Sequence, residues 1–341
     1  MDLTFPFADP PAPGTVTTVA PGLLWARLAL PFRLDHVNIY FIETDDGFLI
    51  VDTGISDKPT RAAWETLFAG PLKGARFAGL IVTHHHPDHI GLAGWLTERL
   101  DIPLLTSRTA FFACLTFFNS PELLAASPYS RFYIRHGMSE DLAAVVSTMG
   151  HDYMRMLSKP PFTYQRLAAG DLLPAGGRTF AVMSGDGHSP EQLMLHAPAD
   201  KLFLAADQVI EKISPNVSVT AFEPWGNPLG AFLASQEVIA ATVADDTLVL
   251  AGHRLPFYGA AARCRALVAH HRERCDVIAD ACAAAPKSAA DLIPVLFDKR
   301  PLSPHETSFA FSEILAHLNH MAASGEVTWE EDGGRARVRS A

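Results

Sequence analysis

Apolar residues in the first third of the chain follow two patterns, one typical of strands and one typical of helices. Short β-branched and aromatic runs bounded by turn residues predict strands, and these runs are residues 16–20, 23–30, 37–43, 48–52, 80–82 and 102–106. Asp45-Asp46-Gly47 predicts a hairpin between the third and fourth runs. Helical spacing predicts helices over residues 59–70 and 91–100. Strands alternating with helices indicate layered α/β packing.

The pattern changes over residues 107–168, where helical spacing rich in Phe, Leu and Met replaces the strand-like runs. We expect a helical insert there. Strand-like runs return at residues 178–183, 193–196, 202–206 and 247–250, and a helix is predicted over 228–241. This second group of strands extends the predicted α/β domain to residue 258.

The remainder, residues 259–341, is predicted to be a separate, mainly helical module. Helices are expected over residues 260–285 and 291–297. Ser303 and Glu306 have the spacing of a capping box. The helix that follows places one set of apolar residues on a single face, namely Phe311, Ile314, Leu315, Leu318 and Met321. Strand-like runs on either side of Gly333-Gly334 predict a terminal hairpin.

The densest chemistry in the chain follows the apolar run Leu80-Ile81-Val82. Five metal-capable side chains occur within six residues, namely His84, His85, His86, Asp88 and His89. Imidazole and carboxylate groups are the usual protein ligands of zinc and similar divalent ions. A buried strand end does not need such groups for packing, because buried polar groups must find partners. The cluster therefore predicts a metal site.

The spacing within this cluster predicts two sets of ligands. His84 and His86 are two residues apart, so on an extended segment they point to the same side. Asp88 and His89 come after Pro87, where we expect a helix to begin. His85 lies between the first two and points away, which favours a supporting role over a ligand role.

The pattern His84-x-His86-x-Asp88-His89 resembles the signature of the metallo-β-lactamase superfamily. Four further positions of this chain match later or earlier motifs of that superfamily in the expected order, each at the end of an apolar run: Asp52, His188, Asp207 and His253. The resemblance covers roughly residues 15–258. It implies an αββα sandwich for the α/β domain.

The resemblance also implies how the residues divide between two metals. One metal would be held by His84, His86 and His188, the other by Asp88, His89 and His253, with Asp207 bridging the two. Asp52 and His85 would contact the ligand side chains and hold them in position without binding a metal themselves. All these donors are nitrogen or oxygen, so two zinc ions are expected, with iron or manganese as alternatives. A hydroxide between the metals would be the nucleophile, and Asp88 would orient it or carry its proton to the leaving group.

The chain departs from the superfamily pattern in two places. Many members have Gly-His-Thr-Pro-Gly-His at the third motif, whereas this chain has Ser189 after His188 and Glu191-Gln192 in place of the second Gly-His. The fourth motif, often Gly-Asp, is Ala206-Asp207 here. Neither change removes a ligand, but the first blurs assignment to a subfamily.

We expect the insert at 107–168 to form a cap that supplies a largely apolar substrate pocket. Its candidate polar groups are Tyr133, His151 and Tyr153, and the loop that contains Trp225 is a further candidate. The C-terminal module resembles the winged-helix modules of some superfamily members. Because its last helix carries Glu313, His317 and His320 instead of a row of Lys and Arg, we expect it to pack or to form a homodimer contact.

The composition of the chain limits the classes of partner that we expect it to bind. The chain has 27 Lys and Arg against 37 Asp and Glu, a net charge of −10, which disfavours nucleic acid as a partner. No apolar run is long enough to span a bilayer, and the first residues do not resemble a signal peptide. The four cysteines form no CxxC pair and are expected to be thiols. A cytoplasmic protein acting on a small molecule is predicted.

Three hypotheses for function remain. The first is a metal-dependent hydrolase of an ester-type bond, a thioester as in hydroxyacylglutathione hydrolases or a lactone. The second is a phosphodiesterase or ribonuclease of the same superfamily, which should have a basic groove. The third is an iron-dependent persulfide-type oxygenase or a nucleic-acid-binding regulator. We favour the first hypothesis because of the apolar insert, the acidic composition and the full set of ligands.

Overall fold

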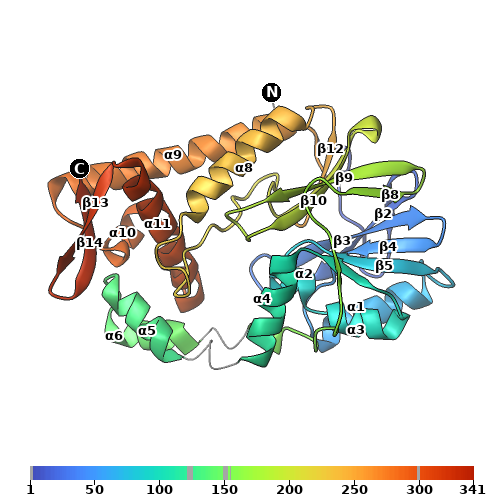
Figure 1. Ribbon diagram of the computed structural model, residues 1–341, viewed down its shortest axis with the longest axis horizontal. Coiled ribbons are helices and arrows are strands. Elements are labelled where there is room, and N and C mark those ends of the chain that lie inside the picture. Colours follow the sequence, from blue (N-terminus) through green and yellow to red (C-terminus); the bar gives the residue numbers. More distant parts are fainter. Residues whose placement is uncertain (1–2, 121–125, 149–152, 154, 298–299) are drawn as a thin grey trace. The chain divides into compact units, whose positions relative to one another are not determined.

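Two β-sheets form the centre of the first of two units into which the chain folds (Figure 1). The computed structural model describes residues 3–120, 126–148, 153, 155–297 and 300–341. The first unit comprises residues 1–119, 153–215 and 238–264, and the second comprises 120–152, 216–237 and 265–341.

The first sheet contains both antiparallel and parallel strands. Its strands, in spatial order, are β1 Thr17–Ala20, β2 Leu23–Ala29, β3 His36–Thr44, β4 Gly47–Val51, β5 Phe77–Val82, β6 Leu104–Thr106 and β7 Gln165–Arg166. Strands β1 to β4 pair antiparallel, and the predicted hairpin at Asp45-Asp46 is confirmed by the pairing of Thr44 with Gly47. Strands β4 to β7 pair parallel. The carboxyl ends of β4 and β5 therefore meet at one edge.

The second sheet has the spatial order β12-β11-β10-β9-β8. Its strands are β8 Leu172–Ala175, β9 Arg178–Gly185, β10 Gln192–Ala197, β11 Leu202–Ala206 and β12 Leu248–Ala251. All pairs are antiparallel except β11 with β12. This exception brings the carboxyl ends of β11 and β12 side by side.

Two apolar layers hold the first unit together, one between the sheets and one under the helices. The layer between the sheets joins Trp25 and Ile81 of the first sheet to Phe180 and Leu195 of the second. The other layer joins the first sheet to the helices that flank it, which are α1 Lys58–Ala69, α2 Pro87–Ile90, α3 Ala93–Leu100 and α4 Arg108–Asn119. A short 3-10 helix spans Pro198–Asp200. The predicted sandwich of sheets flanked by helices is confirmed.

The second unit is mainly helical and ends in a hairpin. Its elements are α5 Ala126–Arg135, α6 Glu140–Ser147, α10 Ala289–Leu296, α11 Pro304–Ser324, β13 Val327–Asp332 and β14 Arg335–Ser340. Helices α8 Pro228–Thr242 and α9 Ala260–Ala284 each contribute to both units. The predicted capping box is present, because Ser303 and Glu306 bond each other's backbone N–H. The predicted apolar face of α11 is buried.

The structure differs from the sequence predictions in three respects. Residues 165–166 form β7 within the segment that was predicted to be helical, because β6 offers an open parallel edge. Strand β8 was not predicted. Residues 120–152 and 216–237, which lie before the predicted domain boundary, group with the C-terminal segment, and the boundary at residue 258 itself stays a prediction.

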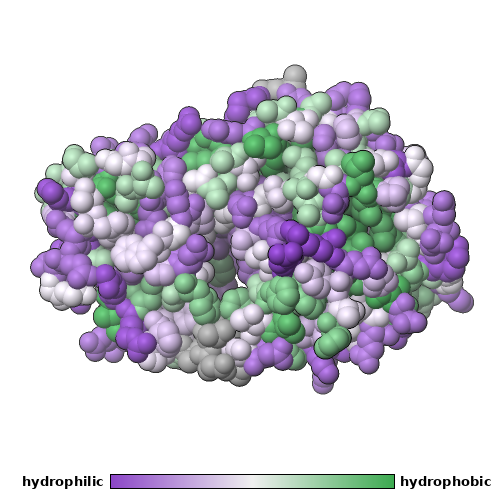
Figure 2. All heavy atoms as spheres, viewed as in Figure 1, coloured by the Kyte–Doolittle hydropathy of each residue, from purple (hydrophilic) through white to green (hydrophobic). Residues whose placement is uncertain are grey.

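The surface mixes polar and apolar side chains, and the cysteines carry no disulfide. Hydrophilic and hydrophobic residues are intermixed over the face shown in Figure 2, and large exposed apolar side chains include Phe112, Phe162 and Trp225. All four cysteines are buried thiols. Within the described ranges, no helix combines the length and apolar character that crossing a bilayer requires.

Candidate metal centre

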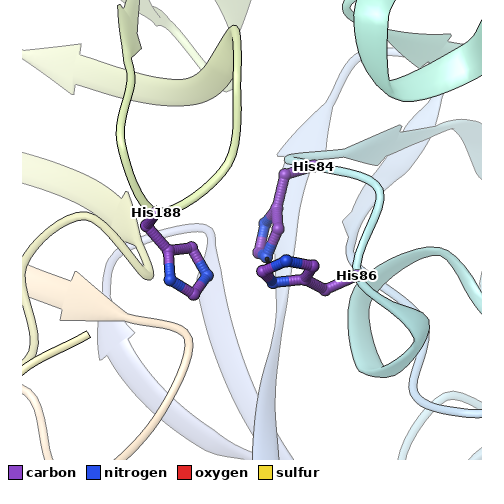
Figure 3. Close-up of side chains that lie close together, drawn as sticks. All are labelled: His84, His86 and His188. Atoms are coloured by element: carbon purple, nitrogen blue, oxygen red, sulfur yellow. Dashed lines mark hydrogen bonds between the residues drawn. The ribbon is translucent and has the colours of Figure 1, made fainter. Parts of the chain in front are cut away.

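The predicted ligands lie where strand ends of the two sheets meet. The segment after β5 carries His84 and His86, and the loop after β9 carries His188. Figure 3 shows these three imidazoles turned toward one another from two different loops. Each offers a nitrogen, and the three nitrogens lie within 4.8 Å of one another. Nε2 of His84 is 3.1 Å from Nδ1 of His86.

A second group of donors lies beside the first. Asp88, His89 and His253 also offer three ligand atoms within 4.8 Å of one another. Oδ2 of Asp88 is 3.4 Å from Nε2 of His253 and 3.6 Å from Nε2 of His89. His89 and Asp88 come from α2, and His253 follows β12.

Asp207, at the end of β11, lies within reach of both groups. Its Oδ2 is 3.5 Å from Nε2 of His188 in the first group. The same oxygen is 3.1 Å from Nε2 of His253 and 3.5 Å from Nε2 of His89 in the second. All seven predicted ligands are therefore brought together, with one carboxylate between two sets of three donors.

Two buried atoms of the cluster are consistent with bound metal. Among the described residues, Nε2 of His89 and Oδ1 of Asp207 are buried and have no hydrogen-bond partner. Buried polar atoms rarely lack a partner, so a buried atom without a hydrogen bond indicates that a water molecule or an ion binds there. The donor set is nitrogen and carboxylate oxygen, which suits zinc, iron and manganese. The residues present thus fit two divalent ions.

Glycine at position 252 makes room for this cluster. A Cβ at Gly252 would lie 2.3 Å from Oδ1 of Asp207 and 2.9 Å from Cε1 of His89. Both distances are shorter than a carbon atom tolerates, and both atoms belong to fixed parts of the cluster. Any larger residue would therefore displace a ligand.

Burial and neighbouring charges set opposite protonation preferences within the cluster. Burial, reinforced by adjacent imidazoles, holds the pKa values of His84 and His86 well below the ordinary value. Burial also acts to lower the pKa of His253, but the carboxylates of Asp207 and Asp88 outweigh it and raise this pKa to about 9. The same balance raises the pKa of His89 well above its ordinary value. Without metal, His89 and His253, which lie beside the carboxylates, are therefore protonated near neutral pH.

Asp52 orients ligands of both groups through its carboxylate. Its Oδ2 accepts a hydrogen bond of 2.8 Å from Nδ1 of His89 and one of 3.0 Å from Oγ1 of Thr83. Because that hydroxyl donates to Asp52, it accepts from Nδ1 of His84 at 2.9 Å. Both imidazoles consequently carry the proton on Nδ1 and present Nε2 to the cluster, which is how supporting groups fix the tautomer of a metal-binding histidine.

His253 is oriented in the same way, but by the backbone. Its Nδ1 donates to the carbonyl of His36 at 2.6 Å. The ring of His36 is itself held, since Nδ1 donates to Asp35 and Nε2 accepts from the N–H of Arg254. Neither Thr83 nor His36 was predicted from the sequence to contribute to the site. Thr83 could have been noticed as a polar residue between an apolar strand and a ligand, whereas nothing in the sequence distinguished His36.

Backbone strain concentrates at this site. Six described non-glycine residues have a positive φ, and four of them adjoin the cluster: Asp52 at 66°, Glu191 at 50°, Ala206 at 46° and Arg254 at 67°. Two of these, Glu191 and Ala206, are the positions where superfamily motifs often have glycine. Strained conformations persist when surrounding structure requires them, and they gather at functional sites.

Glu191 connects the His188 loop to the start of the insert. Its Oε2 accepts from the N–H and the hydroxyl of Thr109, at 2.9 and 2.7 Å, in the first turn of α4. Its Oε1 is 3.3 Å from NH2 of Arg166 in β7. A glycine could make neither contact. Glu191, which stands where many superfamily members have glycine, therefore links both ends of the insert to the loop that carries His188.

His85 lies outside the ligand groups, beside an aromatic wall. Its Nδ1 is 2.9 Å from Oγ of Ser189, and the hydroxyl of Tyr153 donates to its carbonyl. The rings of Phe117 and Tyr153 meet edge to face, with centroids 5.2 Å apart. Tyr153 is thus a neighbour of the metal loop within the first unit.

The other predicted pocket residues are not placed at the site by the structure. Tyr133 is buried in the second unit, where its ring packs edge to face on Phe311. Trp225 belongs to the same unit and is 60% exposed. His151 lies outside the described residues. Pocket roles for these three residues stay predictions.

Comparison with known proteins gives a consistent result. The family model described as "Metallo-beta-lactamase superfamily" matches residues 32–253, and that described as "Metallo-beta-lactamase-like, C-terminal domain" matches residues 275–340. The chain is 38% identical to a beta-lactamase domain protein from Burkholderia ambifaria of known structure, covering 99% of this chain and 98% of that one with a TM-score of 0.91. A metallo-beta-lactamase family protein from Thermus thermophilus is 28% identical, with coverage of 95% and 100% and a TM-score of 0.81. The probable metallo-hydrolase YqjP of Bacillus subtilis (strain 168) is 24% identical over 89% of this chain and 94% of its own length.

Proposed function

This chain belongs to the metallo-beta-lactamase superfamily and is a metal-dependent hydrolase, and on that premise we propose that it cleaves an ester-type bond, a thioester or a lactone, in a partly apolar small molecule. One observation carries the proposal. Asp207 lies between two sets of three nitrogen or oxygen donors, so the chain can hold two neighbouring ions.

The seven candidate ligands would form two sets, one for each ion. His84, His86 and His188 would hold one ion, Asp88, His89 and His253 the other, and Asp207 would contact both. Divalent ions in such a site activate a water molecule near neutral pH and polarise the oxygen of the bond to be cleaved. The set includes two carboxylates, whose negative charge partly offsets that of the ions.

Asp88 is the carboxylate suited to move a proton. Its side chain is 19% exposed, compared with 7% for Asp207. Although burial acts to raise the pKa of Asp88, the imidazoles of His89 and His253 lower it well below the ordinary value. An ionised carboxylate at the open side of the cluster can orient the attacking water and pass its proton to the leaving group.

The surroundings favour an apolar acyl substrate over a polyanion. Phe117 and Tyr153 form an aromatic wall beside the metal-loop residue His85. Such walls bind apolar groups of small ligands. A net charge of −10 gives no long-range attraction for a nucleic acid.

We further propose that the C-terminal winged-helix-like module packs within the protein or forms a homodimer contact. We also propose that the protein is cytoplasmic.

A side-by-side turnover assay tests the proposal. The zinc-loaded chain would be given an acyl thioester, a lactone, a bis-aryl phosphodiester and a short RNA, each with and without chelator. Chelator-sensitive hydrolysis of the acyl substrates, lost in Asp88→Asn and kept in the control His196→Gln, is expected. Cleavage of the phosphodiester or RNA alone would overturn the substrate class and support the phosphodiesterase alternative.

A further inference from the structure

A separate group of metal-capable side chains lies in the second unit, on two helices. His271 belongs to α9, and Glu313 and His317 belong to α11. One donor atom from each lies within 4.8 Å of the other two. We propose that these three residues bind one divalent transition-metal ion, such as Zn²⁺ or Co²⁺, which cross-links α9 to α11.

The distance between the two imidazoles suits a shared ion. Nδ1 of His271 is 3.1 Å from Nε2 of His317. The pair His84 and His86 in the first unit has the same separation between facing nitrogens, 3.1 Å. Two nitrogens that each lie about 2.1 Å from a tetrahedral zinc ion are about 3.4 Å apart, so a small relaxation admits the ion.

The tautomer of His317 leaves a lone pair directed toward His271. Nδ1 of His317 is 2.8 Å from the backbone carbonyl of Glu313, one turn earlier on α11. A carbonyl can only accept, so Nδ1 carries the proton and Nε2 carries the lone pair that a metal needs. Metal-binding histidines commonly donate their other ring N–H to a carbonyl or carboxylate in this way.

The carboxylate of Glu313 is held in place by Arg274. NH1 of Arg274 lies 3.3 Å from Oε1 of Glu313. Arg274 is itself fixed, since its Nε donates to Nε2 of His270 at 3.1 Å and its guanidinium lies 4.6 Å from the centre of the Phe297 ring. Carboxylate ligands are usually hydrogen-bonded from outside. The guanidinium charge also opposes a cation, so this ion should bind more weakly than the ions of the first unit.

Burial assigns the ion a structural role. His271 and His317 are both 0% exposed, and the side chain of Glu313 is 15% exposed. A substrate could not reach an ion enclosed in this way. A cross-link between residues 46 positions apart would instead stabilise the folded form of the second unit, because an ion that binds only the folded state shifts the folding equilibrium toward it.

Metal counting on the full chain tests this site. Apo-protein would be equilibrated with Co²⁺, and bound cobalt would be measured per chain for the wild type, His317→Gln, Glu313→Gln and the control His305→Gln, an exposed histidine of the same helix. We expect the wild type and His305→Gln to bind one ion more than the other two variants, and that extra ion to be the first removed by a chelator. The difference between variants is the readout, so the result does not depend on how many ions the first unit holds.

A second measurement uses the wild-type chain and requires no variant. Crystals of the wild type grown with zinc would be examined for anomalous scattering at the zinc edge. A peak between His271 and His317 is expected. Equal cobalt counts in all folded variants, or peaks at His84 and Asp207 without one between His271 and His317, would refute the site and leave a hydrogen-bonded histidine pair.

Discussion

Nδ1 of His89 donates a 2.8 Å hydrogen bond to Oδ2 of Asp52, a residue 37 positions earlier in the chain. A carboxylate only accepts, so the bond forces His89 to present Nε2 to the cluster. Through Thr83, the same carboxylate also fixes the tautomer of His84. One buried side chain thus orients ligands in both groups.

Replacing Asp52 by asparagine should therefore weaken metal binding by about 10- to 100-fold. Both carboxylate oxygens accept hydrogen bonds, from Thr83 and His89, and the asparagine NH₂ would oppose one of these donors. Asparagine tolerates the positive φ of 66°, so backbone strain does not change. Competition with a chromophoric chelator measures the effect. Asp101→Asn, at φ 52° outside the site, is the matched control, and equal losses in both variants would contradict the assignment.

Removing a ligand should remove metal as well as activity. Asp207→Ala should reduce the bound metal most, because its carboxylate lies between both groups, whereas His188→Ala should chiefly affect the ion held with His84 and His86. Elemental analysis of the folded variants gives the metal content. His196→Ala, a buried histidine of β10 outside the clusters, is the control. Full wild-type metal content in either ligand variant would argue strongly against this site.

Adding one methyl group at position 252 should disrupt the centre without removing any donor. The Cβ of Gly252→Ala would lie 2.3 Å from Oδ1 of Asp207, so the carboxylate must move. We expect loss of at least one bound ion and of most hydrolysis, while circular dichroism shows an unchanged fold. An alanine variant with wild-type metal content would mean that the loop relaxes at little cost.

Strain at Ala206 should make a glycine substitution favourable. Ala206 has φ 46°, a left-handed conformation that costs about 1–2 kcal/mol for a residue with a Cβ. Glycine adopts it freely, but its greater loss of conformational entropy on folding costs about 0.5–1 kcal/mol, so Ala206→Gly should raise the free energy of unfolding by up to about 1.5 kcal/mol. Urea denaturation measures this change. The neighbouring buried Ala205 lacks a positive φ, so Ala205→Gly should destabilise the protein, and the same sign in both variants would disprove the strain argument.

Metal affinity should rise with pH. In the metal-free chain, burial acts to lower the pKa of His253, but Asp207 and Asp88 raise it to about 9. Metal binding needs the unprotonated Nε2, so each ion that binds there must release this proton. The apparent association constant should therefore increase by at least about tenfold per pH unit between pH 6.5 and pH 8.5, because His89, whose pKa is also raised well above its ordinary value, must lose a proton as well. An affinity that does not change over this range would show that neither His253 nor His89 is a ligand.

The α/β fold class and the residues of the candidate metal cluster could be predicted from local features of the sequence. Strand runs ending in His84, His188, Asp207 and His253 could be identified because side-chain chemistry and apolar periodicity are both local properties of the chain. The capping box at Ser303 and Glu306 and the hairpin at Asp45-Asp46 were predictable for the same reason. All seven predicted ligands lie together in the structure.

How these ligands are held depends on contacts between distant parts of the chain. The hydrogen bonds between Asp52 and His89 and between His36 and His253 join residues 37 and 217 positions apart, and no local pattern records such pairs. Glu191 looked like a mere departure from a glycine motif, yet its carboxylate caps α4 across 82 positions. The pairing of His271 with His317 likewise depends on how two helices pack. Local sequence specifies which groups are present, whereas long-range packing specifies which groups meet.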